Sequence, residues 1–205
     1  MAGTLQLGGI TVLEESGGTV TAPNNLSVTG TISGTIGSTT TFPAGMILNV
    51  QSTSLTRASS QFTSTSFTDI VDDQGTALSV SVTPKTNSKI FLMASLGISG
   101  TDYNIYLRFM RDSNAIGINT NPGGSRPAAT MSTYGSGPSR QYEIMPTPMQ
   151  FLDTTPGGNG STSIVYKIQW SVQSSGSAYI NRSQRNTDVT DGTCISTITA
   201  MEIAG

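Results

Sequence analysis

The chain contains no histidine and only one cysteine, and both features limit the catalytic mechanisms, metal sites and disulfides that it can have. Without histidine, Ser-His-Asp catalysis, Cys-His catalysis and most zinc sites are excluded. A single cysteine, Cys194, cannot form a disulfide within the chain. Because Cys194 lies in an apolar strand pattern, we expect a buried, inert thiol. We therefore expect no enzyme, no bound metal and no cofactor.

Charged residues are also scarce, at 11% of the 205 residues, and the formal net charge is -2. The ten Lys and Arg residues form no visible cluster, so the electrostatic signature of a nucleic-acid-binding protein is missing. The sequence has no signal-peptide pattern at its start, and no segment approaches the roughly 20 apolar residues of a membrane span. We expect synthesis in a cytoplasm, and either retention there or export as part of a larger particle.

The stretch LSVTGTISGTIGSTTT, residues 26–41, has strand periodicity with glycines on the apolar parity. One copy of such a thread buries almost nothing, and glycine weakens an isolated strand. Several identical threads wound together would place the apolar parity inside. We therefore predict an oligomeric neck over residues 26–42, most simply a trimer. Its predicted core residues are Leu26, Val28, Ile32 and Ile36.

Residues 1–25 precede this neck and form a separate short segment. Short alternating runs occur around Leu5 and Val12, and Thr19–Thr21 has the pattern of a further short strand. Pro23 and the asparagines after it are turn formers. We predict a particle-attachment segment that gains order mainly from its neighbours.

The remaining residues, 43–205, are predicted to form a β-sandwich head. Pro43-Ala44-Gly45 marks its start, and no helical stripe of useful length follows. Alternating apolar runs separated by Gly, Pro, Asn and Ser turns predict antiparallel strands near residues 46–50, 78–82, 90–98, 105–110, 166–172 and 194–203. An all-β, jelly-roll-like sandwich is favoured because the strands are many and the last one is apolar. Trp170 falls on the inward parity of its strand, which predicts a core position.

The region from Gly123 to Pro146 has few aliphatic residues and is predicted to be a long loop. Loops of that length in compact domains are usually functional or packed against a partner. Tyr134, Arg140 and Tyr142 lie in this region, and flat aromatic and guanidinium groups suit contacts with a glycan or a protein. These three residues are the candidate receptor-binding residues, although ordinary packing of the tyrosines is an open alternative.

Adjacent carboxylates at Asp72 and Asp73 resemble a hydrolase pair, but neighbouring strand residues point to opposite faces. Glycoside hydrolysis needs two carboxyl groups facing one sugar, which this pair does not provide. Because Asp-Asp-Gln-Gly is a turn-forming sequence, we predict a turn here.

Two groups of charged residues remain to be placed. Arg182, Arg185, Asp188 and Asp191 form a solvated loop, an ion-pair network that crosses between subunits, or a cation or anion site at the trimer axis. Arg108 and Arg111 lie on opposite faces of one strand, so at least one should face solvent or an acidic partner, for which Glu202 and Asp112 are the candidates.

Several runs in the head carry a resemblance: LRFMRD at 107–112, YINR at 179–182 and ITAMEI at 198–203. With the runs around them, they resemble head modules at the C-terminal end of tail fibres and related virion proteins of marine bacteriophages, including phages of cyanobacteria. The resemblance covers roughly residues 42–205, and the N-terminal part matches fibre shafts only in style. It implies a trimeric appendage on a phage particle, and it transfers no binding residue.

Together these observations predict a structural virion protein that takes part in host attachment. Its expected partners are two further copies of itself, another virion protein bound by the N-terminal segment, and a host surface saccharide or envelope protein. A capsid decoration or head-fibre protein that stabilises the particle is the alternative. A polysaccharide depolymerase is disfavoured by the missing histidine and the small size.

Overall fold

The structure, a computed structural model, describes residues 4–7, 10–16, 19–21, 42–135, 138–188 and 190–205. The chain divides into two compact units, residues 1–40 and 41–205. The described residues form β-strands and one 3-10 turn, with no α-helix among them. Within these ranges, no helix has the length and hydrophobicity needed to cross a membrane. Leu26, Val28, Ile32 and Ile36 of the predicted neck lie outside the described residues, so the neck stays a prediction.

The first unit contains a small antiparallel sheet in the order β1-β2-β3. Its strands are β1 (Thr4–Leu7), β2 (Ile10–Ser16) and β3 (Thr19–Thr21). A register shift interrupts the β1–β2 pairing between Leu5 and Gln6. The short strand predicted at Thr19–Thr21 is confirmed.

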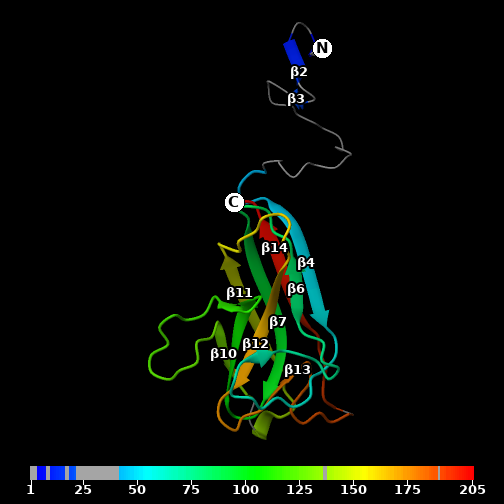
Figure 1. Ribbon diagram of the computed structural model, residues 1–205. Helices are drawn as coiled ribbons and strands as arrows, with labels where there is room; N and C mark the ends of the chain where they lie inside the picture. The colour runs from blue at the N-terminus through cyan, green and yellow to red at the C-terminus, as the bar shows by residue number, and fades with distance from the viewer. Residues whose placement is uncertain (1–3, 8–9, 17–18, 22–41, 136–137, 189) are drawn as a thin grey trace. The chain divides into compact units, whose positions relative to one another are not determined.

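The second unit, which we call the head, is built from two antiparallel sheets (Figure 1). Sheet I has the order β10-β8-β12-β5, with β6 also paired to β12 and β9 also paired to β8. Its strands are β5 (Thr68–Asp69), β6 (Ser79–Val82), β8 (Asn104–Arg111), β9 (Asn114–Ile116), β10 (Met131–Tyr134) and β12 (Ile164–Val172).

Sheet II has the order β11-β7-β14-β4, with β13 also paired to β7. Its strands are β4 (Ile47–Leu55), β7 (Lys89–Gly100), β11 (Met145–Asp153), β13 (Ala178–Ile180) and β14 (Ser196–Ile203). The long central strand β7 and the terminal strand β14 lie side by side in Figure 1, where they are green and red.

One hydrophobic core lies between the two sheets, as in a β-sandwich. The alternating run on β7 contributes its inward parity, from Ile90 to Ile98, and all five of those residues are buried. Trp170 on β12 is 2% exposed, and its ring stacks on Phe62 with the centroids 4.6 Å apart. The predicted all-β class and the core position of Trp170 are therefore confirmed.

Two predictions about the ends of strands are wrong. Residues 123–146 are not one loop, because they contain β10, a 3-10 turn at Pro138–Arg140 and the start of β11. Cys194 is not inside a strand: β14 begins at Ser196, and Cys194 is only partly buried. Its sulfur occupies the space beside Gly97, where a Cβ would collide with it. Burial raises the pKa of the Cys194 thiol, which opposes thiolate formation.

The prediction that Asp112 or Glu202 would pair with Arg111 or Arg108 is also wrong. Arg111 on β8 forms its ion pair with Asp153 at the end of β11, 2.9 Å away. Glu202 is buried and accepts hydrogen bonds from the Lys85 N–H at 2.6 Å and the Ser88 hydroxyl at 2.7 Å. Both carboxylates therefore hold neighbouring segments in place, which sequence spacing alone did not indicate.

Candidate binding surface

The outer face of sheet I carries a connected row of polar side chains. Lys167 forms an ion pair with Asp69 at 2.7 Å, and the Gln169 amide donates to the same carboxylate at 2.8 Å. Arg108 donates to the Gln169 amide oxygen at 2.7 Å, and its guanidinium lies 4.1 Å from the centroid of the Phe67 ring. Partial burial lowers the pKa of Arg108. This face is therefore polar, charged and internally paired.

Beside this row lies a hollow of about 520 Å³, which we call the sheet I hollow. It forms where β8 and β10 meet the connection between β9 and β10. Its lining residues are Asn104, Tyr106, Asn119, Pro122, Arg126, Pro127, Ala129, Thr130, Met131 and Ser132. None of these residues is acidic.

The strand register explains why Tyr106 is available in this hollow. Tyr106 lies on the outward parity of β8, directly opposite Ser132 on β10 and Ser171 on β12. Both neighbours are small, so the half-buried Tyr106 ring is not covered by a bulky cross-strand partner.

The connection above the hollow is closed at its base by backbone hydrogen bonds. The Asn119 N–H donates to the Ala129 carbonyl at 3.2 Å, and the Thr130 N–H donates to the Leu107 carbonyl at 2.8 Å. At its tip, Gly123 and Gly124 have φ values of 68° and 58°, a left-handed conformation that favours glycine. These two glycines turn the chain at the tip of the connection, and Arg126, just after them, lines the sheet I hollow.

The three predicted receptor-binding residues do not form one site. Tyr134 ends β10 opposite Asn104, so it borders the sheet I hollow. It is 51% exposed, and its hydroxyl donates to the Asp102 carbonyl at 3.1 Å. Arg140 instead pairs with Glu143, and the exposed Tyr142 ring lies 5.8 Å from the Arg185 guanidinium. Among the described residues, neither of these two contacts Tyr134.

Sequence reasoning did not identify Tyr106, Asn119 or Arg126 as site residues. Strand alternation puts Tyr106 on the face of β8 opposite to that of Leu107, but the residues next to it come from other strands. The only indication of a binding role for Arg126 in the sequence is that it is a single cationic residue in a Gly/Pro-rich segment.

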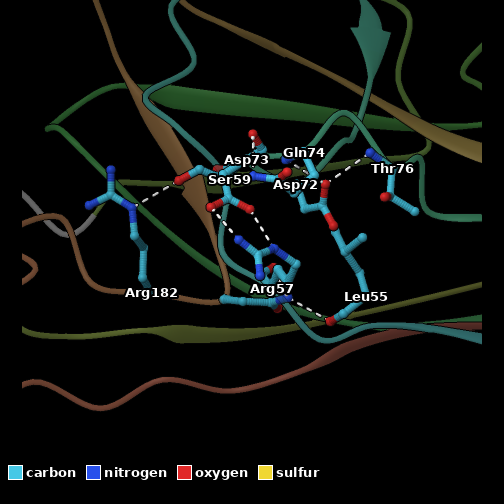
Figure 2. A network of polar contacts seen from close by, with 9 residues as sticks. Leu55, Arg57, Ser59, Asp72, Asp73, Gln74, Thr76 and Arg182 are labelled. Carbon is cyan, nitrogen blue, oxygen red and sulfur yellow. Dashed lines mark hydrogen bonds and ion pairs between the residues drawn. The ribbon is translucent and has the colours of Figure 1, made fainter.

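The Asp72-Asp73 pair is a turn, as predicted. Asp72 is buried, and its Oδ1 accepts the backbone N–H groups of Gln74 at 2.9 Å and Thr76 at 2.8 Å. Figure 2 shows Asp73 facing Arg57 instead, with two hydrogen bonds of 2.7 and 2.8 Å. The two carboxylates therefore have separate structural partners, and they do not face a common substrate position.

The C-terminal charged group is a local network within one turn. Asp191 pairs with Arg185 and also accepts the Ser183 hydroxyl at 2.7 Å and the Thr187 N–H at 2.9 Å. Arg182 turns away and donates to the Ser59 carbonyl at 3.0 Å (Figure 2). The Arg185 hydrogen bond, with those from Ser183 and Thr187, lowers the pKa of Asp191 well below its usual range.

This lowered pKa predicts an acid-dependent loss of stability. The carboxyl has a lower pKa in the folded chain than in the unfolded chain, so Asp191 stabilises the fold above about pH 4. That contribution is lost progressively as the pH falls toward the folded pKa. We expect Asp191→Asn to make the urea midpoint less dependent on pH between about pH 5 and pH 2.

The matched control is Asp188→Asn, at an exposed position in the same turn without an ion pair in the described structure. It should leave the pH dependence of the urea midpoint unchanged. Identical pH profiles for Asp191→Asn and the unmodified chain would contradict the assignment.

Among the described residues, no group of three or more His, Cys, Asp and Glu side chains could hold a metal ion. No protein family model matches the chain, and no curated protein sequence matches it.

Proposed function

We propose that this chain is a structural subunit of a bacteriophage particle, a homotrimeric tail-fibre-type appendage that takes part in host attachment. In this proposal, residues 26–42 form the trimeric neck and residues 1–25 attach to another virion protein. The head is a jelly-roll-like sandwich, and the protein has no catalytic activity. The two outer faces of the head, one polar and one apolar, support the proposal best.

An apolar row crosses the whole outer face of sheet II. The register places Leu152 of β11 opposite Phe91 of β7, Phe91 opposite Met201 of β14, and Met201 opposite Val50 of β4. Val50 is 51% exposed and Leu152 is 39% exposed. Four apolar side chains from four strands thus lie in one line on an accessible face, which is typical of a protein-binding surface.

The same face has a hollow and almost no charge. Lys89, at one end of β7, is the one charged residue on the outward parity of the four long strands of sheet II. A hollow of about 480 Å³ lies beside the apolar row and is lined by side chains that include Met93, Pro148 and Thr199. Because Lys89 lies at the end of this face, the apolar row and the adjacent hollow can pack against a copy of the chain without burying an unpaired charge.

The edge of sheet II favours face packing over strand addition. Pro146 and Pro148 lie on the edge strand β11, and proline offers no N–H to a further strand. The outer face, four strands about 4.8 Å apart and about four side-chain levels long, covers roughly 500 Å². A standard interface takes about 800 Å² from each partner. A neck of like chains would supply the missing area.

The course of the chain agrees with a jelly-roll-like order. Strands β7 and β8 are consecutive in the chain but belong to different sheets, and the same is true of β11 and β12. Such repeated crossing between sheets is a feature of sandwiches with Greek-key connections.

Light scattering and native mass spectrometry of the full chain test the proposal. We expect three times the chain mass of 21.3 kDa. Val50→Lys places a charge on the apolar row and should raise the concentration at which the oligomer dissociates by about tenfold or more. Val165→Lys is the matched control, because Val165 is an exposed strand valine on the outer face of sheet I.

A stable full-length monomer would overturn the proposal. Equal weakening by both valine variants would show that the sheet II outer face is not the subunit interface. Labelling the protein on intact particles separates an attachment appendage from the alternative, a capsid decoration or head-fibre protein.

A further inference from the structure

We propose that the sheet I hollow binds an acidic saccharide, with Tyr106 contacting the sugar ring and Arg126 pairing with its carboxylate. This inference rests on the proposed attachment function and names the class of receptor. It concerns the polar face of the head, and not the sheet II outer face.

The guanidinium of Arg126, without an acidic partner in the described structure, points to an anionic ligand. Each of the other six arginines has a partner in the described structure: Asp73, Asp153, Glu143 and Asp191 pair with four of them, and Arg108 and Arg182 contact aromatic rings. Arg126 is exposed and has no carboxylate or ring partner among the described residues. A guanidinium can bind a carboxylate through two parallel hydrogen bonds, which gives geometric specificity as well as charge.

The remaining groups in the hollow suit a sugar. One face of a pyranose ring is made of C–H groups and packs well on a flat aromatic ring such as Tyr106. The Asn119 side-chain oxygen accepts the Asn121 N–H at 2.9 Å, and its amide N–H groups have no acceptor among the described residues, so they can donate to a sugar hydroxyl. Ser132, opposite Tyr106, adds a hydroxyl that donates and accepts.

The shape and the charge of the hollow exclude two other ligand classes. One arginine is too few for a nucleic-acid backbone, which needs several cations along a groove. The lining combines amide, hydroxyl and guanidinium groups with the apolar side chains of Pro122, Pro127, Ala129 and Met131, so it suits a ligand with polar and apolar faces better than a purely apolar one. A volume of about 520 Å³ accommodates a few sugar units.

Paired oligosaccharides provide the sharpest test. Hexuronate-containing oligosaccharides, and the same compounds after reduction of the carboxyl to an alcohol, are immobilised as an array at equal density. The full-length protein should bind members of the acidic series at least about tenfold more strongly than their reduced counterparts, the range expected for a charged hydrogen bond. Dense display also compensates for weak single sites.

Two variants assign the contacts. Arg126→Gln should abolish the preference for the acidic series, and Arg57→Gln, which removes an exposed arginine already paired with Asp73, should leave it intact. Tyr106→Ala should weaken binding of both series. Tyr106→Phe keeps the ring and should retain binding even if the alanine variant does not fold.

Each outcome is decisive. Absence of binding to every acidic oligosaccharide, or an acidic preference that survives Arg126→Gln, would overturn the inference. The oligomeric mass of the same samples is measured in parallel. A trimer without acidic preference contradicts this inference alone, whereas a monomer contradicts the proposed function.

Discussion

Replacing Asp153 with alanine should lower the free energy of unfolding of the head by about 3–5 kcal/mol, the usual cost of breaking a buried ion pair. The Asp153 carboxylate is 5% exposed and accepts hydrogen bonds from Arg111 at 2.9 and 3.0 Å and from the Tyr166 hydroxyl at 2.9 Å. Burial, and then the charge of Asp153, raise the pKa of Tyr166, so this hydroxyl remains a protonated donor. Without Asp153, the Arg111 guanidinium would lose its carboxylate and keep the Thr155 carbonyl at 2.6 Å, and the Tyr166 hydroxyl would lose its acceptor.

The matched control is Asp73→Ala. Asp73 also has an arginine partner, Arg57, in a geometry of similar quality. The difference is exposure: the Asp73 and Arg57 side chains are 42% and 54% exposed. Exposed pairs contribute little, so Asp73→Ala should change the urea midpoint only slightly. Both variants are measured at one protein concentration, because oligomerisation shifts apparent stability. Equal losses in the two variants would contradict the role given to burial.

Asn181→Ala should be nearly as damaging, with a loss of roughly 3–5 kcal/mol. The Asn181 amide donates to the Leu55 carbonyl at 2.7 Å and to the Arg57 carbonyl at 2.9 Å. Its oxygen accepts the Ser196 hydroxyl at 2.6 Å. Figure 2 shows the polar contacts around Leu55 and Arg57. Truncation would leave two carbonyls without this donor and a buried hydroxyl without its acceptor.

The loss at Asn181 has two contributions, the missing hydrogen bonds of the side chain and the strain of placing alanine in a left-handed backbone conformation. Its φ is 62°, a left-handed conformation that costs alanine about 1–2 kcal/mol. Asn181→Gly should therefore recover about 1 kcal/mol relative to alanine, but not the hydrogen bonds. Asn186→Ala is the control, because Asn186 has a φ of 53° but is exposed. It should show the backbone cost alone, as measured by urea unfolding. Similar losses at both asparagines would contradict the role of the side-chain network.

Strand alternation explains most of what could be predicted about the head. A period of two over residues 90–98 places one parity inside, whatever the sheet order, and all five of its members are buried. The same argument placed Trp170 in the core, and the turn-forming sequence Asp-Asp-Gln-Gly placed Asp72 and Asp73 in a turn. Each of these predictions depends only on residues close together in the chain.

Predictions that depended on which strands are neighbours in the sheets were wrong or were not made. Glu202 and Asp112 were the candidate acidic partners of Arg108 and Arg111, but the fold brings Arg111 to Asp153, 42 positions away. The loop prediction for residues 123–146 was wrong because β10 gains its strand character by pairing with β8. Cys194 was placed in a strand because its sequence neighbours are apolar, but the space beside Gly97 accommodates its sulfur outside the ladder.

By itself, the amino-acid sequence determined that the head is all-β, which strand parities are buried, and that histidine-based chemistry is excluded. These properties follow from local periodicity and composition. Only the tertiary structure decided that Val50, Phe91, Leu152 and Met201 form one row, and that Tyr106 and Arg126 share one hollow. The physical reason is that strand order and register are set by long-range pairing, which single-strand periodicity does not encode.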